Sequence, residues 1–273
     1  MGRNLVAIVI FGVLALAGCR SMGVIESDAG QYYTAHDAKV RFTMRSPSGE
    51  GPFPAVILMH GCSGLGESVG RGMAQHADHL VDAGFVALIL DSFTTRGIDS
   101  TCTSSRKAAE STLFRQHDAV HTLRHLQALP DIDPENVFLM GQSEGGSVAV
   151  KLAAHPLSSV VKDDAMVEAS GQPWFAAIVA YYPWCPHVPK WLDTPLLVLS
   201  GEEDDWTPSQ GCIWHKAVVK GAPYDVKIYE DAHHSFDLPM PVQHYVGYTV
   251  GGHPAAAADS RMRMIAWFRE HMR

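Results

Sequence analysis

The sequence predicts one main domain of the α/β class, built on a mostly parallel central sheet. Short runs rich in Val, Ile, Leu and Phe alternate with segments whose apolar residues recur every three and four positions. The chain has 273 residues and is 47% hydrophobic, which is enough for one sizeable core. No internal repeat or low-complexity block interrupts the pattern. Strands that alternate with helices require crossover connections, which favour parallel pairing.

Seven apolar runs have the length of about four to eight residues that is typical of buried strands. In chain order they are Lys39–Met44, Ala55–Met59, Val86–Leu90, Val137–Met140, Ala176–Ala180, Pro195–Ser200 and Asp225–Tyr229. Helical periodicity is clearest in five segments between or after them. These are Gly70–Ala83, Leu113–Leu129, Glu144–Ala154, Ser209–Val219 and Asp259–His271.

The N-terminus is typical of an export signal. Arg3 precedes an apolar run from Leu5 to Ala17 that is too short for a comfortable membrane span. The ending Leu16-Ala17-Gly18-Cys19 resembles the bacterial lipoprotein signal, in which cleavage leaves a lipidated cysteine as the first residue. We therefore expect a signal peptide over residues 1–18 and a stable lipid anchor on Cys19. An ordinary secretory signal is the alternative.

The same resemblance gives an expected location and domain organisation. Arg20, in the position after the lipidated cysteine, fits sorting to the outer membrane facing the periplasm. The polar stretch Ser21–Gly30 lacks periodicity, so residues 19–30 are predicted to be a tether and residues 31–273 the folded domain. The chain carries 21 basic and 29 acidic residues, a formal charge of −8, and no Lys/Arg run. This composition argues against a nucleic-acid partner.

Four cysteines remain besides Cys19, an even number in a chain expected to be exported. They allow three pairings, and the order of the loops favours Cys62 with Cys102 and Cys185 with Cys212. Four buried free thiols are the alternative. The spacing of Cys and His residues does not indicate zinc. His117, His121 and His125 stand four apart on one predicted helix, which we interpret as a helix face rather than a metal site.

The stretch VFLMGQSEGG, residues 137–146, sets one serine between a predicted strand and a predicted helix. G-x-S-x-G in this setting is typical of a nucleophile elbow, in which Ser143 sits on a sharp, strained turn. The neighbouring glycines avoid the clashes that bulky side chains would create there. Ser143 is thus the candidate nucleophile, and the backbone N–H of Glu144 is the candidate first oxyanion donor.

A serine nucleophile needs a base and an acid that orients the base. The acidic loop GEEDDWTP follows the strand ending at Ser200, and EDAHHSF follows the strand ending at Tyr229. Both loops lie at the carboxyl edge of the predicted sheet, where such sites gather. His60-Gly61-Cys62 follows the strand Ala55–Met59 and matches an oxyanion motif, with the Cys62 N–H as second donor. The Cys62 thiol is not proposed as the nucleophile.

Together these residues resemble the dienelactone hydrolase family of α/β-hydrolases. The matching pieces are HGCSG, DSFTTRG, the helix with Arg115 and Asp118, GQSEGG, YYPWC, GEEDDWTP and AHHSFD, and they span most of the chain after residue 50. The resemblance implies an α/β-hydrolase fold, and its spacing selects Asp204 as acid and His234 as base. Asp205 and His233 are the neighbouring alternatives. Dienelactone hydrolase proper carries cysteine as nucleophile, whereas serine stands here at Ser143.

The resemblance implies hydrolysis of a small carboxylic ester or lactone through an acyl-enzyme, without a metal or other cofactor. Tyr181, Trp184 and Trp206 lie near the ends of predicted strands and are candidates for the substrate pocket or for core packing. Residues 237–258 could shape the pocket mouth or form a surface excursion. The sequence has no insertion long enough to build a large cap domain.

Other functions stay open at this point. A peptidase of the prolyl-peptidase type would use the same triad, but such relatives usually add a propeller or a cap. A non-catalytic envelope lipoprotein could keep the fold for binding, but it would have no chemical need for Ser143, Asp204 and His234 together. A thioesterase or acyltransferase would use the same groups.

Overall fold

The computed structural model describes residues 39–154, 173–185 and 190–273, together with the backbone of residues 25–33. The strands of its central sheet are β1 (Ile25–Tyr33), β2 (Lys39–Ser46), β3 (Phe53–Met59), β4 (Val86–Asp91), β5 (Ile132–Gln142), β6 (Ile178–Tyr181), β8 (Leu196–Gly201) and β10 (Tyr224–Tyr229). Two short ribbons pair β7 (Trp191–Leu192) with β9 (Lys220–Gly221) and β11 (Gln243–Tyr245) with β12 (Tyr248–Val250). The helices are α1 (Glu67–Asp82), η1 (Thr94–Arg96), α2 (Ser105–Gln127), α3 (Glu144–Leu152), α5 (Gln210–His215) and α6 (Pro254–Glu270).

The central sheet has the order β1-β2-β4-β3-β5-β6-β8-β10. β1 and β2 join antiparallel to their neighbours, and every pair from β4 to β10 is parallel. The prediction of a mostly parallel sheet flanked by helices is therefore confirmed. The carboxyl ends of β3, β5, β8 and β10 lie on one edge, so the loops that follow these strands can share one site.

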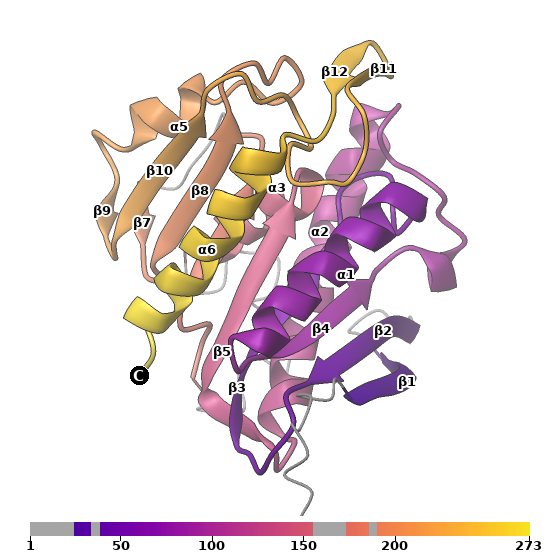
Figure 1. Cartoon of the computed structure of the whole chain (residues 1–273), viewed down its shortest axis with the longest axis vertical. Coiled ribbons are helices and arrows are strands. Elements are labelled where there is room, and N and C mark those ends of the chain that lie inside the picture. The colour runs from indigo at the N-terminus through magenta and orange to yellow at the C-terminus, as the bar shows by residue number, and fades with distance from the viewer. Residues whose placement is uncertain (1–24, 34–38, 155–172, 186–189) are drawn as a thin grey trace, which may run out of the picture.

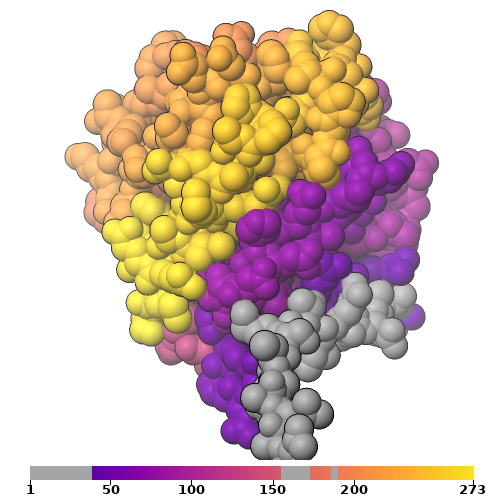
Figure 2. Space-filling model, in the orientation of Figure 1, coloured from indigo at the N-terminus to yellow at the C-terminus, as the bar shows by residue number. Residues whose placement is uncertain are grey.

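Helices cover both faces of the sheet (Figure 1). Alternate residues of each strand face opposite sides: Val56 and Leu58 of β3 pack in a core under α1 and α6, whereas Ile57 and Met59 pack in a core under α2 and α3. The segments containing α1 and α6, far apart in sequence, lie side by side on the face shown in Figure 2. Burial on both faces explains why the central strands read as continuous apolar runs.

The predicted tether is wrong from Ile25 onward. Residues 25–33 form β1, which pairs antiparallel with β2 from Tyr33 opposite Lys39 to Ile25 opposite Ser46. The polar sequence gave no strand signal because an edge strand is held by backbone pairing and does not need an apolar face. Within the described residues the domain thus begins at Ile25 rather than at residue 31, and the predicted signal peptide and Cys19 lie outside them.

The helices α2 and α6 begin earlier than predicted, because residues that cap or begin a helix determine their first residue and the apolar periodicity does not. α2 begins at Ser105, eight residues before the predicted Leu113, with the Ser104 hydroxyl accepting the Lys107 N–H at 3.3 Å. α6 begins at Pro254 instead of Asp259, since proline is favoured in the first turn. α5 is shorter than the predicted Ser209–Val219. None of the described helices is long and apolar enough to span a membrane.

Candidate active site

Ser143 occupies a strained turn between β5 and α3, as the elbow motif predicts. Its backbone has φ 53° and ψ −114°, a conformation that costs free energy for any residue with a side chain. The turn brings backbone segments into close contact: a Cβ at Gly145 would lie 2.6 Å from the His60 carbonyl oxygen, and one at Gly141 would clash with the Gly145 backbone. Glycine at these two positions therefore permits the turn.

Three predicted side chains meet at the carboxyl edge of the sheet. The distance from Ser143 Oγ to His234 Nε2 is 3.0 Å, and that from His234 Nδ1 to Asp204 Oδ2 is 2.9 Å. Asp204 and His234 are almost fully buried. A neutral His234 with its proton on Nδ1 donates to Asp204 and accepts the hydroxyl proton of Ser143. This geometry suits transfer of that proton from serine to histidine.

The two neighbouring alternatives do not take part in this arrangement. The Asp205 carboxylate accepts the backbone N–H of Thr249 at 3.0 Å, and the half-buried His233 ring lies with Nδ1 3.1 Å from the Glu203 carbonyl oxygen. Asp204 instead accepts the Trp206 and Thr207 N–H groups at 3.0 and 2.8 Å. These donors fix the carboxylate toward His234.

A buried carboxylate holds the loop that carries the base. Asp237 lies three residues after His234 and accepts hydrogen bonds from His76 at 2.6 Å, Gln142 at 2.5 Å and the Tyr182 hydroxyl at 2.6 Å. Burial raises the pKa of Asp237, but the hydrogen bonds from His76 and Tyr182 outweigh it and hold the pKa below its ordinary value. Because Gln142 precedes the nucleophile, this cluster connects the Ser143 turn to the His234 loop.

Sequence reasoning missed Asp237, Tyr182 and Thr207 as supporting residues, although all three stand inside the quoted motifs. The Thr207 hydroxyl lies 2.8 Å from Asp204 Oδ2, and the Tyr182 ring packs edge-on to His234 with centroids 4.6 Å apart. Their positions next to the candidate acid, base and strand end were the available signal. Their side-chain directions depend on contacts between distant segments.

A pocket of about 230 Å³ opens over Ser143 and His234. Trp206 lines it, as predicted, but Tyr181 and Trp184 do not. Tyr181 ends β6 with its ring in the core under α1 and α6, fully buried, whereas Trp184 is 56% exposed at the surface. Tyr182, with φ 37° just beyond the strand, turns into the pocket instead. The residues of the β11–β12 region that line the pocket are Leu238, Met240, Gln243, Tyr245 and Val250.

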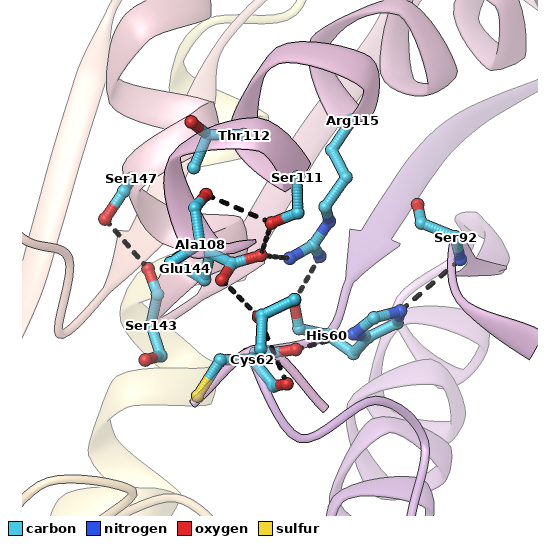
Figure 3. Close-up of polar contacts among 12 residues, drawn as sticks. His60, Cys62, Ser92, Ala108, Ser111, Thr112, Arg115, Ser143, Glu144 and Ser147 are labelled. Carbon is cyan, nitrogen blue, oxygen red and sulfur yellow. Dashed lines mark hydrogen bonds and ion pairs between the residues drawn. The ribbon is translucent and has the colours of Figure 1, made fainter. Parts of the chain in front are cut away.

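Cys62 and Glu144, which carry the two candidate oxyanion donors, both lie near Ser143, the candidate nucleophile (Figure 3). Cys62 lines the pocket, and the adjacent Gly61 approaches Ser143 so closely that a Cβ there would lie 3.3 Å from the serine Cβ. Glu144 is the first residue of α3, where backbone N–H groups have no partner inside the helix. Within the described residues, neither the Cys62 N–H nor the Glu144 N–H donates a hydrogen bond.

The structure contains two disulfides, Cys62–Cys102 and Cys185–Cys212, which are the pairs favoured by the loop order. The first lies in the pocket wall. The second joins the segment after β6 to α5. Among the described residues no group of His, Cys, Asp or Glu is arranged to hold a metal ion. His117 and His121 are buried in α2, and the His125 ring packs against Phe42 with centroids 5.4 Å apart.

His60 is a fully buried histidine that contacts two loops of the site. Nδ1–H donates to the Gly61 carbonyl oxygen at 2.7 Å, and Nε2 accepts the Ser92 N–H at a longer 3.4 Å. Burial, aided by the nearby Arg115 charge, lowers the pKa of His60 from 6.5 to about 3. The folded protein therefore keeps His60 neutral at a pH where the unfolded chain protonates it.

We expect His60→Gln to weaken the acid sensitivity of folding. Between pH 6.5 and about 3 the unfolded wild type binds one more proton at this site, so its stability falls as the pH falls, by up to about 1.4 kcal/mol per pH unit. Above pH 6.5 both states are neutral and the contribution is constant. Urea unfolding of both proteins at pH 4 to 8 measures the two slopes. Parallel stability curves below pH 6.5 would contradict this account.

The parallel sheet, with a strained serine turn at its carboxyl edge, defines an α/β-hydrolase. Residues 40–162 and 163–272 match the model of the dienelactone hydrolase family. The chain belongs to this family, as the sequence motifs predicted, and is thus a carboxylic ester hydrolase.

Solved structures of similar proteins share the fold at low sequence identity. A dienelactone hydrolase-like promiscuous phosphotriesterase from metagenomic libraries is 20% identical, with 92% of this chain and 99% of that chain covered at a TM-score of 0.67. The dienelactone hydrolase from Anabaena variabilis is 17% identical, with coverage of 90% and 100% and a TM-score of 0.61. The esterase Est2 from Thermogutta terrifontis, with propionate bound, is 15% identical, with coverage of 88% and 92% and a TM-score of 0.61.

Proposed function

We propose that the protein hydrolyses small carboxylic esters through an acyl-enzyme on Ser143. The observation that carries the proposal is the chain of contacts from Ser143 to His234 at 3.0 Å and from His234 to Asp204 at 2.9 Å, with the first two residues lining the pocket. In this arrangement a buried base is held in one orientation against the serine hydroxyl. This is the geometry that serine acyl transfer requires.

The proposed reaction has two halves. His234 takes the hydroxyl proton as Ser143 Oγ bonds to the ester carbonyl carbon, and the Cys62 and Glu144 N–H groups stabilise the oxyanion that forms. His234 then gives the proton to the leaving alcohol as the ester C–O bond breaks. Water, deprotonated by His234, attacks the acyl-serine, and the proton returns to Ser143 as the carboxylic acid leaves. Each oxyanion donor contributes about 3 kcal/mol in comparable enzymes.

The pocket favours a small, uncharged acyl group. Its wall near the nucleophile includes Val69, Leu238, Met240 and Val250, and the Trp206 ring stacks on Tyr248 with an interplanar angle of 8°. Among the described lining residues, Glu67 and His234 are the only ones with ionisable side chains other than tyrosine, so no lysine or arginine pairs with a substrate carboxylate. The structure of the esterase Est2 has propionate bound, and propionate has a short acyl chain.

We expect p-nitrophenyl butyrate to be hydrolysed with a kcat/KM at least about tenfold above that of p-nitrophenyl hemisuccinate. The two acyl groups have the same chain length, but the second places an unpaired carboxylate in the apolar pocket, which costs free energy. Steady-state kinetics on both esters gives the ratio. In Glu67→Gln the ratio should change by less than about threefold, because the Glu67 side chain is 86% exposed and paired with Arg71. Equal kcat/KM values for the two esters would exclude this pocket preference.

We further propose that the enzyme is exported and anchored in the outer membrane through a lipid on Cys19, facing the periplasm. The signal-like sequence before Cys19 supports this location. The two disulfides also support it, because disulfides persist in oxidising compartments. Metabolic labelling with a radioactive fatty acid tests the anchor: label should enter the wild type and be absent from Cys19→Ala.

The proposed function is tested by reacting the full-length chain with a fluorophosphonate. Such a reagent should form one adduct, on the peptide containing Ser143, and should abolish ester turnover in proportion. A folded protein that hydrolyses p-nitrophenyl acetate without labelling at Ser143 would contradict the proposed nucleophile. A folded protein that neither labels nor turns over esters would instead favour a binding lipoprotein.

A further inference from the structure

Glu144 buries its carboxylate directly behind the nucleophile, among three donors from other segments. Arg115 Nη1 donates to Oε1 at 2.8 Å, the Ser111 hydroxyl donates to the same oxygen, and the Thr101 hydroxyl donates to Oε2 at 2.6 Å. We call these four residues the Glu144 cluster; Figure 3 labels Glu144, Arg115 and Ser111. The Arg115 side chain is fully buried and the Glu144 side chain is 6% exposed. The sequence places the Glu144 carboxylate at a predicted helix start and Arg115 on a helix that matches the family, but it does not predict that the two side chains meet.

The Glu144 cluster contacts the backbone on the other side of the oxyanion site. The second nitrogen of the Arg115 fork, Nη2, donates to the carbonyl oxygen of His60, two residues before Cys62. The guanidinium also lies over the Phe93 ring, with its carbon 5.1 Å from the ring centroid. One rigid, planar cation therefore spans from the start of α3 to the loop after β3.

A second connection runs through Thr101. Its hydroxyl donates to Glu144, and its backbone N–H donates to the Cys62 carbonyl oxygen at 2.9 Å. The next residue, Cys102, forms the disulfide with Cys62. The segment from His60 to Cys62 and Glu144, which carry the two candidate oxyanion N–H groups, are thus connected twice: Arg115 joins Glu144 to His60, and Thr101 joins Glu144 to Cys62.

Stability alone does not explain a buried ion pair at this place. Removing two charges from water is costly, and well-packed apolar residues of similar size often serve folding equally well. Oxyanion stabilisation, in contrast, depends on donors fixed at hydrogen-bond distance from the position that the charge will occupy. A small displacement of either loop would lengthen those hydrogen bonds in the transition state and slow the reaction.

We propose that the side chains of Glu144 and Arg115 are positioning residues that fix the two oxyanion N–H groups relative to Ser143. The inference rests on the proposed serine mechanism. The side chains themselves do not contact the reacting atoms. They hold the Glu144 and Cys62 backbone groups at a set separation.

The double variant Arg115→Met/Glu144→Met tests this, because it removes the ion pair without leaving a charge unpaired and keeps both backbone N–H groups. Thr101 and Ser111 retain carbonyl acceptors, Cys62 O at 3.4 Å and Ala108 O at 3.1 Å. We expect kcat for p-nitrophenyl butyrate to fall about tenfold to hundredfold, with KM within about twofold, since oxyanion donors act mainly in the transition state. The rate of fluorophosphonate labelling at Ser143 should fall by a similar factor.

The matched control is Arg96→Met/Asp118→Met. This largely buried pair, with a bidentate contact at 2.8 and 2.9 Å, joins α2 to η1, and Arg96 donates to the Ser92 carbonyl oxygen rather than to the loop after β3. Its kcat should stay within about twofold of the wild type. Arg115→Lys should be intermediate, because one ammonium cannot reproduce the planar fork between Glu144 and the His60 carbonyl oxygen.

A folded double variant with wild-type kcat overturns the proposal, and so does an equal loss of kcat in the Arg96/Asp118 control. If the double variant does not fold, the kinetics of Arg115→Lys and of Thr101→Val test the proposal instead. Wild-type kcat values in both variants would overturn it, whereas a lowered kcat with an unchanged KM in either variant would support it. The wild type is labelled first. If the wild type is not labelled at Ser143, the serine mechanism itself is wrong. If the wild type is labelled but the double variant keeps the wild-type kcat, only the positioning role is wrong.

Discussion

Replacement of Ser143 by alanine is expected to lower ester turnover by about 10⁴-fold or more. The variant keeps the pocket, His234 and both candidate oxyanion donors, but it lacks the oxygen that lies 3.0 Å from His234 Nε2 and that we propose forms the acyl-enzyme. In related triads, loss of the nucleophile costs nearly as much as loss of all three members, and the remainder acts only through binding and the oxyanion site. Turnover of p-nitrophenyl butyrate by Ser143→Ala measures the loss.

Ser147→Ala is the matched control. Ser147 lies one helical turn further along α3, its hydroxyl bonds to the Ser143 carbonyl oxygen at 3.1 Å, and it does not line the pocket. Its activity should stay within about threefold of the wild type, since a hydrogen bond of this kind contributes about 1 kcal/mol. Retention of more than a few per cent of activity in folded Ser143→Ala, free of contaminating esterase, would contradict the assignment of the nucleophile.

The second large effect is expected for Asp204→Asn, at about 10³-fold to 10⁴-fold in kcat. The wild-type carboxylate accepts the Nδ1 proton of His234 at 2.9 Å and two backbone N–H groups. An asparagine that keeps its oxygen on those N–H groups turns its NH₂ toward His234. This favours the wrong tautomer, whose Nε2 carries the proton and cannot take one from Ser143. The loss should appear in kcat with little change in thermal stability.

Asp205→Asn is the control for this prediction, because it changes the same charge one residue away. Asp205 accepts the Thr249 N–H of the β11–β12 ribbon, which an asparagine oxygen can still accept. Activity within about threefold of the wild type is expected. If Asp205→Asn were the damaging change and Asp204→Asn the mild one, the acid would be misassigned.

The fold could be predicted because its central strands β4, β6 and β8, and most of β3 and β5, are buried on both faces. All seven apolar runs overlap strands of the central sheet. In β3, the side chains from Val56 to Met59 point alternately into the two cores, so none of these positions is open to a polar residue. β1 escaped prediction because its pairing with β2 depends on backbone hydrogen bonds. The ribbon of β11 and β12 escaped it because each strand has only three residues.

In the candidate site, too, features that depend on neighbouring residues could be predicted, and features that depend on contacts between distant segments could not. The Ser143 turn is encoded by adjacent glycines, and family spacing separated Asp204 and His234 from Asp205 and His233. Tyr182 lines the pocket in place of the predicted Tyr181. Neighbouring residues of a strand point to opposite faces, so the tyrosine that reaches the pocket depends on the residue at which β6 ends. The Glu144 cluster joins residues 29 and 43 positions apart, a relation that no local pattern reveals.

The most direct test of the central claim is to trap the acyl-enzyme. The full-length chain is mixed with p-nitrophenyl acetate, quenched in acid within one turnover and digested, and the peptides are analysed by mass spectrometry. The proposed serine mechanism gives one acetyl group, on Ser143, that disappears on longer incubation in water and is absent from Ser143→Ala. Turnover of the ester with no acetyl group on Ser143, or with acetyl on another residue at the same rate as turnover, would contradict it.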